Sequence, residues 1–401
     1  TYITGQHNPE LNKSTIDQTI SQINTAKNDL HGAEKLQRDK GTANQEIGQL
    51  GYLNDPQKSG EESLVNGSNT RSEVEEHLNE AKSLNNAMKQ LRDKVAEKTN
   101  VKQSSDYIND STEHQRGYDQ ALQEAENIIN EIGNPTLNKS EIEQKLQQLT
   151  DAQNALQGSH LLEEAKNNAI TEINKLTALN DAQRQKAIEN VQAQQTIPAV
   201  NQQLTLDREI NSAMQALRDK VGQQNNVHQQ SNYFNEDEQP KHNYDNSVQA
   251  GQTIIDKLQD PIMNKNEIEQ AINQINTTQT ALSGENKLHT DQESTNRQIE
   301  GLSSLNTAQI NAEKDLVNQA KTRTDVAQKL AAAKEINSAM SNLRDGIQNK
   351  EDIKRSSAYI NADPTKVTAY DQALQNAENI INATPNVELN KATIEQALSL
   401  S

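Results

Sequence analysis

Met88-Lys89-Gln90-Leu91-Arg92-Asp93 is the stretch that decides how the rest of the chain is read, because it returns twice. It comes back as Met214-Gln215-Ala216-Leu217-Arg218-Asp219 and again as Met340-Ser341-Asn342-Leu343-Arg344-Asp345. Both steps, from 88 to 214 and from 214 to 340, are 126 residues long. Self-similarity at a fixed period indicates a repeat architecture whose units contact mainly their neighbours.

Other residues keep the same step with no insertion or deletion. The repeated positions hold two tyrosines, an Asn-Lys pair, a leucine and an asparagine: Tyr107, Tyr233 and Tyr359; Tyr118, Tyr244 and Tyr370; Asn12-Lys13, Asn138-Lys139, Asn264-Lys265 and Asn390-Lys391; Leu50, Leu176 and Leu302; Asn54, Asn180 and Asn306. The chain thus holds just over three periods. Because it starts and ends inside a repeat, we expect an excised piece of a longer protein.

The composition is unusually polar for a folded chain. Of its 401 residues, 32% are hydrophobic and 2% are aromatic. So little apolar surface leaves two alternatives, disorder or many thin helical bundles with small cores. The regular period favours the bundles.

The charge and the missing cysteines exclude several classes of partner and chemistry. A net charge of -18 disfavours nucleic acid and anionic membranes, whose binding depends on Lys and Arg. The absence of cysteine excludes disulfides and thiolate catalysis. No apolar run approaches the roughly 18 residues of a spanning helix, so we expect no membrane contact, and neither end reads as a secretory signal or an anchor.

The middle repeat shows the expected helices in order. Residues 161–176 place apolar side chains at steps of three and four, which predicts an amphipathic helix. Asn180 followed by Gln183 resembles a capping box and starts a second helix. A third helix begins at Thr196, and its apolar stripe continues to Val221, which is about 25 residues or about 38 Å.

A second set of helices completes the period. A polar stretch at 222–241 interrupts the pattern before a helix that contains Tyr244. Pro261 marks a turn, the next stripe runs over 268–282, and Gly284 is expected to end that helix. The predicted fold class is all-α: an elongated rod of tandem three-helix bundles, two in each 126-residue repeat, joined by long shared helices.

Two module families resemble these patterns. Leu176, Leu179-Asn180, Gln183, Val191 and Thr196 resemble the GA module of Gram-positive surface proteins, whereas Tyr233, Tyr244, Ile254-Ile255 and the helix with Ile268, Ile272 and Ile275 resemble the FIVAR module. Their alternation at a fixed period is similar to the family of giant staphylococcal extracellular-matrix-binding surface proteins. The resemblance predicts GA modules at 32–80, 158–206 and 284–332, and FIVAR modules at 1–31, 81–157, 207–283 and 333–401, the first and last incomplete.

That resemblance implies a location on the bacterial cell surface or cell wall, fibronectin or another host matrix protein as partner, and a role in attachment and biofilm. It also implies a part in envelope integrity under osmotic stress. Tight albumin binding is not expected, because the second GA helix is polar outside its stripe. Its polar positions are Asp181, Gln183, Arg184, Gln185, Lys186, Glu189 and Asn190.

The candidate partner contacts are the few aromatic residues in the polar loop after each long helix: Tyr107, Tyr233, Phe234 and Tyr359. The alternative is that the paired tyrosines pack under this loop with their hydroxyls bonded to backbone. We expect the loop to be the most accessible contact region. The repeated Arg92, Arg218 and Arg344 are expected to lie along the bundles and pair locally.

No motif for catalysis, a metal or a cofactor is present in the sequence. It has no nucleophile elbow, no Gly-rich phosphate loop, and no His-x-x-x-His pair among its eight histidines. The stretch Asn235-Glu236-Asp237-Glu238 lacks EF-hand spacing and is predicted to be a solvated loop. We therefore expect a non-enzymatic monomer without cofactors. It is either a multivalent adhesin or a structural spacer that reinforces the cell envelope.

Overall fold

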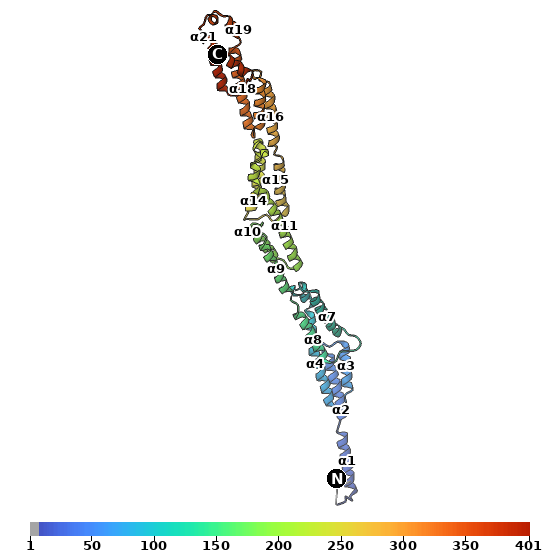
Figure 1. Ribbon diagram of the computed structural model, residues 1–401. Helices are drawn as coiled ribbons and strands as arrows, with labels where there is room; N and C mark the ends of the chain where they lie inside the picture. Colours follow the sequence, from blue (N-terminus) through green and yellow to red (C-terminus); the bar gives the residue numbers. More distant parts are fainter. Residues whose placement is uncertain (1–7) are drawn as a thin grey trace. The chain divides into compact units, whose positions relative to one another are not determined.

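The computed structural model describes residues 8–401, and within that range every regular element is a helix (Figure 1). The chain divides into two compact units. Unit 1 extends to Thr171 and includes Asn190–Leu204, and unit 2 comprises Glu172–Glu189 and Thr205–Ser401. Three helices cross this division: α9 (Gly158–Asn174), α10 (Asp181–Gln192) and α11 (Ile197–Gly222).

Unit 1 holds the first GA-like and FIVAR-like bundles. Besides parts of α9 to α11, its helices are α1 (Lys13–Asn28), α2 (Gly32–Gly48), α3 (Asp55–Asn66), α4 (Arg71–Ala96), α5 (Lys98–Gln103), α6 (Ser105–Ile108), α7 (Thr112–Ile129) and α8 (Lys139–Asn154). The GA-like bundle consists of α2, α3 and the first half of α4. The FIVAR-like bundle consists of the second half of α4 with α7 and α8.

The long helix α4 serves both of these cores. Val74 and Ala81 lie in the GA-like core with Ile47, whereas Met88 and Leu91 lie in the FIVAR-like core. The apolar stripe is continuous because these side chains recur at helical spacing. The prediction of tandem three-helix bundles joined by long shared helices is confirmed.

Unit 2 repeats this arrangement. Besides parts of α9 to α11, its helices are α12 (Gln224–His228), α13 (Ser231–Phe234), α14 (Glu238–Asp256), α15 (Lys265–Thr280), α16 (Gly284–Glu300), α17 (Thr307–Gln319), α18 (Arg323–Gly346), α19 (Lys350–Arg355), α20 (Ser357–Ile360), α21 (Pro364–Ile381) and α22 (Lys391–Leu400). The helix α18 is the counterpart of α4. It packs on α16 and α17 at one end and on α21 and α22 at the other.

Polar side chains start the helices and also bind the bundles together. Asn54 and Gln57 form the predicted type of capping box. The Asn54 amide also donates to the carbonyl oxygen of Ile128 at 2.9 Å, and the Gln57 amide donates to that of Thr136 at 2.9 Å. Both carbonyls belong to the FIVAR-like bundle, so the cap of the GA-like bundle is also a brace between bundles.

The same brace recurs in unit 2. Asn180 donates to Ile255 O at 3.0 Å, and Gln183 donates to Ile262 O at 2.9 Å. Asn306 and Gln309 make the equivalent bonds one period later. Gln183 was expected on the exposed face of its helix. It is instead buried, because its amide satisfies a carbonyl of the next bundle.

One expectation about the middle repeat is confirmed and one was wrong. The polar stretch 222–241 does interrupt the long helix, since α11 ends at Gly222, and it contains the short helices α12 and α13 before α14 begins at Glu238. Gly284 does not end a helix. α15 ends at Thr280 and Gly284 is the first residue of α16, where a close backbone approach requires glycine.

A buried carboxylate occupies the GA-like core in unit 1. Glu61 is 2% exposed, and its Oε2 has no hydrogen-bond partner among residues 8–401. Burial raises its pKa from the usual 4.5 to about 7, aided by Glu80 and opposed by His77. The equivalent residue one period on is Ala187, so the carboxylate is not needed for packing.

We predict that the first GA-like bundle becomes more stable as the pH falls from about 7 to about 5. A pKa raised in the folded state means that the native bundle binds the proton more tightly than the unfolded chain. Stability is therefore gained below about 7 and fully present below 4.5, by at most about 1.4 kcal/mol per pH unit. The measurement is hydrogen exchange of α3 amides, corrected for intrinsic rates.

The Glu61→Ala variant, which carries the residue of the middle module, should lose this pH response. Substitution of the exposed Glu76 by alanine should leave it unchanged. An identical pH dependence in Glu61→Ala and in the unmodified chain would contradict the assignment.

Candidate functional site

The segment after each long helix carries every predicted contact residue. These post-helix segments are residues 97–111, 223–237 and 349–363, and each contains two short helices. An apolar side chain of the first short helix ties the segment to the FIVAR-like core, as shown by Val101 and Val227, which are 7% and 3% exposed. Each segment is thus folded onto its own bundle.

The paired tyrosines pack edge to face, and the first two pairs do so in the FIVAR-like cores. The ring centroids of Tyr107 and Tyr118 are 6.1 Å apart, those of Tyr233 and Tyr244 are 6.1 Å apart, and those of Tyr359 and Tyr370 are 5.8 Å apart. Such pairs stabilise a core beyond the area that they bury. The packing alternative is therefore the one that the geometry favours for these rings.

The tyrosine hydroxyls were expected to bind backbone, but they do not. The first tyrosine of each pair donates to an aspartate: Tyr107 to Asp119 at 2.9 Å and Tyr233 to Asp245 at 2.6 Å, with Tyr359 and Asp371 alike. The buried Tyr118 and Tyr244 hydroxyls have no hydrogen-bond partner in the described part of the chain. Burial raises the pKa of Tyr118 to about 12, so this group stays neutral.

One large apolar side chain in each segment is exposed at the surface. Phe234 is 39% exposed, and the residues one period away from it are Ile108, 47% exposed, and Ile360, 66% exposed. Of these three residues, only Phe234 was predicted from the sequence to contact a partner, because it is aromatic. Extending the 126-residue step to this position would have found the other two. Each FIVAR-like bundle thus presents one exposed apolar side chain at the same place.

The opposite side of the segment is covered by the next GA-like bundle. Asn109 is 5% exposed, and Asn235 and Glu236 are 2% and 5% exposed. The Asn109 amide donates to Gln195 O at 3.0 Å and its oxygen accepts from the Ile197 amide at 2.9 Å. Part of the loop that was expected to be the most accessible contact region is therefore covered. The prediction that Asn235-Glu236-Asp237-Glu238 is a solvated loop is wrong at Asn235 and Glu236, because these polar groups bind backbone of the following module.

The same frame is built in unit 2. The Asn235 amide donates to Lys321 O at 3.0 Å, and its oxygen accepts from the Arg323 amide at 3.0 Å. An acid one residue later accepts a backbone amide from the turn before the next helix: Asp110 from Gln157 at 2.7 Å, and Glu236 from Ser283 at 2.5 Å. We call this set of contacts the FIVAR–GA junction.

A glycine lets the backbones meet at each junction. A Cβ on Gly158 would lie 2.3 Å from the carbonyl oxygen of Ser105, and one on Gly284 would lie 2.3 Å from that of Ser231. Neither glycine has a positive φ, so close approach is the reason for the residue. Gly32, at the same repeat position, has nothing within 4 Å.

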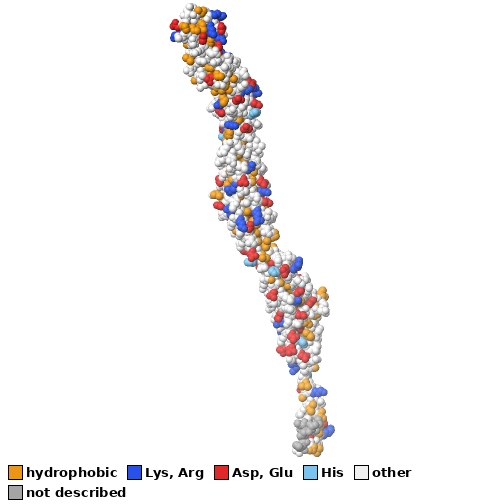
Figure 2. All heavy atoms as spheres, viewed as in Figure 1, with side chains coloured by type: hydrophobic (Ala, Val, Ile, Leu, Met, Phe, Trp, Pro, Cys, Tyr) orange, Lys and Arg blue, Asp and Glu red, His pale blue; other side chains and the backbone are white. Residues whose placement is uncertain are grey.

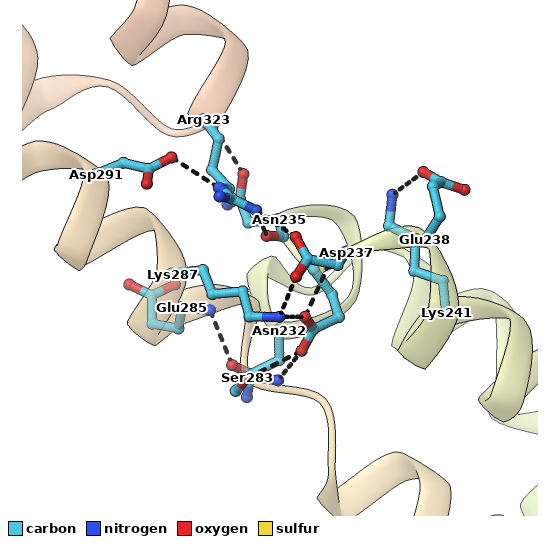
Figure 3. A network of polar contacts seen from close by, with 11 residues as sticks. Asn232, Asn235, Asp237, Glu238, Lys241, Ser283, Glu285, Lys287, Asp291 and Arg323 are labelled. Atoms are coloured by element: carbon cyan, nitrogen blue, oxygen red, sulfur yellow. Dashed lines mark hydrogen bonds and ion pairs between the residues drawn. The ribbon is translucent and has the colours of Figure 1, made fainter.

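In unit 2 the junction also carries an ion-pair network (Figure 3). Lys287 contacts both Glu236 and Asp237, the latter at 2.7 Å. Arg323 reaches Asp237 at 2.9 Å and Asp291 of its own bundle at 2.7 Å. Burial alone would raise the pKa of Glu236, but Lys287 and the Ser283 and Asp237 amides outweigh it and lower the pKa to about 2.

The repeated arginines brace the bundles internally. The Nε atoms of Arg92, Arg218 and Arg344 donate to carbonyl oxygens of Tyr52, Ala178 and Ser304 at 2.8, 2.8 and 2.9 Å. Each bond joins the shared helix to the first loop of the GA-like bundle. These arginines therefore pair with backbone and not with neighbouring carboxylates.

Within residues 8–401, no group of three or more His, Asp and Glu side chains is arranged to hold a metal ion. None of the described helices combines the length and apolar character needed to cross a membrane. On the visible face, acidic and basic side chains are interspersed along the coloured part of the chain (Figure 2).

Two domain models match the chain in alternation. The FIVAR domain model matches residues 1–31, 87–157, 213–283 and 339–399. The GA module model matches residues 33–87, 159–213 and 285–339. The long helices that serve two bundles lie where the two sets of matches meet.

The chain is similar over nearly its whole length to the extracellular matrix-binding protein ebh of Staphylococcus aureus strain MW2. The two are 35% identical over 394 residues, which is 98% of this chain and 4% of that protein. A crystal structure of an EbhA domain from Staphylococcus aureus matches with a TM-score of 0.56 and 26% identity, over 61% of this chain and 98% of that one.

A structure of the extracellular matrix binding protein Embp, from work on Staphylococcus epidermidis adherence to fibronectin, is 35% identical to this chain. It covers 31% of this chain and 99% of its own, with a TM-score of 0.31.

We predict that Gly158→Ala and Gly284→Ala each destabilise their junction by about 1–3 kcal/mol, because the new methyl group forces the backbones apart. Thermal unfolding followed by circular dichroism measures the effect. Gly32→Ala is the matched control. It should be neutral or slightly stabilising, since its Cβ meets nothing and alanine favours a helix. Equal effects at all three positions would refute a junction role.

Proposed function

The chain belongs to the FIVAR domain family, in the form in which FIVAR domains alternate with GA modules, and we propose that it acts as a multivalent adhesive region on a bacterial cell surface. The modules are those of a non-enzymatic, matrix-binding family. The partner in this proposal is an extracellular matrix protein, with fibronectin as the first to test. Attachment and biofilm formation would follow from that binding.

The observation that carries the proposal is the exposed apolar side chain repeated once per FIVAR domain. Ile108, Phe234 and Ile360 occupy one repeat position and are the exposed large apolar residues of the post-helix segments. Next to them, Tyr107, Tyr233 and Tyr359 are half-buried, so only part of each ring supplements the contact. A single such residue supports weak binding only, and repetition supplies avidity.

The relatives named above support the choice of partner. Extracellular matrix binding is part of the name of the Staphylococcus aureus protein to which 98% of this chain is similar. The chain spans about 4% of that protein, so what we propose is that this chain itself takes part in the binding. A surface on which acidic and basic groups alternate suits weak and repeated contacts better than one tight site.

A second candidate function is a structural spacer that binds nothing tightly and reinforces the cell envelope. The braces between bundles favour it. Each GA-like cap donates to carbonyls of the next bundle, and the segments at 97–111 and 223–237 are hydrogen-bonded to the module that follows. These contacts resist bending whether or not a ligand is present.

The test measures binding of the full 401-residue chain to immobilised fibronectin while one, two or all three of Ile108, Phe234 and Ile360 are replaced by serine. We expect the apparent affinity to fall with each replacement and by on the order of a hundredfold for the triple variant, because avidity multiplies weak contacts. Keeping the chain length constant separates valency from reach.

The matched controls are Ile132→Ser and Leu258→Ser. These residues are also related by one period and are 92% and 65% exposed, but they lie away from the post-helix segments. They should leave binding unchanged. No binding by the unmodified chain would favour the spacer, and equal binding by the triple variant would move the contact to another surface.

A further inference from the structure

The two FIVAR–GA junctions within the described chain share a backbone frame but differ in the side chains that overlie it. Both use a buried asparagine, an acid that accepts an amide, and a glycine at the closest approach. Their hydrogen bonds link the post-helix segment to the GA module that follows. They close the junction in both units.

Ion pairs across the junction are present at only one of these two junctions, because only that one carries cations. In unit 2 the positions are Glu236, Asp237, Lys287, Asp291 and Arg323, and every one is in the ion-pair network. One period earlier, in unit 1, the same positions hold Asp110, Ser111, Leu161, Ala165 and Ile197. The acid of that junction pairs with His114 of its own bundle and with no cation of the following one among the described residues.

We propose that the junction between the second FIVAR domain and the third GA module is an ionic-strength-sensitive joint, whereas the preceding FIVAR–GA junction is not. Salt weakens the pairs made by Lys287 and Arg323 and lets the module beginning at Gly284 move on the 223–237 segment. Hydrogen bonds to backbone, including those that the Asp110 and Asp106 carboxylates accept from the Gln157 and Ser159 amides, hold the first junction closed at all salt concentrations.

The network is placed where screening acts on it. The side chains of Lys287 and Arg323 are 31% and 34% exposed, and that of Asp237 is 58% exposed. Counterions therefore reach the pairs. The Debye length falls from about 10 Å at 0.1 M salt to about 3 Å at 1 M, which is comparable with the N–O distances of the pairs.

Asp237 is the centre of the sensitivity. It accepts from Lys287 and Arg323, so two cations of the GA module depend on one exposed carboxylate of the FIVAR domain. Glu236, by contrast, is buried and also holds the Ser283 amide and hydroxyl, so it contributes to closure that salt barely reaches. Salt should loosen this joint without separating it.

The consequence is a chain whose joints respond unequally to ions although their period is identical. The braces from each GA module into the next FIVAR domain are hydrogen bonds to backbone and do not change with salt. Only the joint that carries the ion-pair network does. This behaviour does not depend on what the chain binds.

The test uses the full chain, which contains no cysteine and so permits clean double labelling. One spin-label pair, Gln249→Cys with Glu293→Cys, spans the charged junction. The other, Gln123→Cys with Asn167→Cys, occupies the same positions one period earlier, and all four residues are exposed. Distance distributions are measured by double electron–electron resonance from about 0.05 M to about 1 M NaCl.

We expect the 249–293 distribution to broaden with salt and the 123–167 distribution to stay constant. Lys287→Leu with Arg323→Ile removes both cations of the network and places there the apolar residues of the first junction, so the 249–293 distribution of this variant should not change with salt. Lys287→Arg with Arg323→Lys keeps both charges and should retain the response. Circular dichroism confirms that each variant is folded.

Several outcomes overturn the proposal. A 249–293 distribution that ignores salt refutes it directly. An equal response of both label pairs shows general loosening, not a charged joint. A salt response that persists in the Lys287→Leu, Arg323→Ile variant shows that other groups produce it.

Discussion

The arrangement of the bundles depends on one long helix that contributes side chains to two neighbouring cores. In unit 1, α4 places Val74 and Ala81 in a GA-like core and Met88 and Leu91 in a FIVAR-like core. In unit 2, α18 does the same with Val326 and Met340. Because the helix is continuous, one bundle cannot rotate on the next without breaking i to i−4 hydrogen bonds. The repeat in the sequence is therefore also a mechanical repeat, in which neighbouring bundles share a continuous helix.

Polar side chains between the bundles add cohesion to a chain that has little apolar surface. Asn54, Asn180 and Asn306 each cap a helix and donate to carbonyls of the next bundle. A buried carbonyl without a donor costs free energy, so these bonds are hard to give up. Small cores therefore suffice, because the bundles do not have to hold together by hydrophobic burial alone.

The post-helix segment has two faces with different roles. One face is covered: Asn109 and Asn235 bind backbone of the following module, and glycine allows the chains to touch. The other face exposes Ile108, Phe234 or Ile360. Closing the joint fixes the direction in which the exposed residue is presented. The structural and the adhesive readings of the chain thus use the same segment.

Periodicity was enough to predict the main helices of each bundle, the shared long helix and the capping boxes, because these follow from spacing along one chain. It was not enough to say that Gly284 begins a helix, that Gln183 is buried, or that Tyr107 donates to Asp119 and not to backbone. Each of those facts depends on atoms from another element of the fold. In the sequence alone, Gly284 is typical of a helix end. The nearby carbonyl of Ser231 shows instead that a close backbone approach requires the glycine.

Positions one period apart do not always share partners. Asp110 and Glu236 each accept a backbone amide from the following module, but Glu236 also contacts Lys287 of that module, whereas Asp110 contacts His114 of its own bundle. The amino-acid sequence by itself determined the repeat, the helices and which face of each is apolar. Tertiary structure alone decided which of those faces is covered and where the polar groups find partners, since burial depends on neighbours and not on spacing.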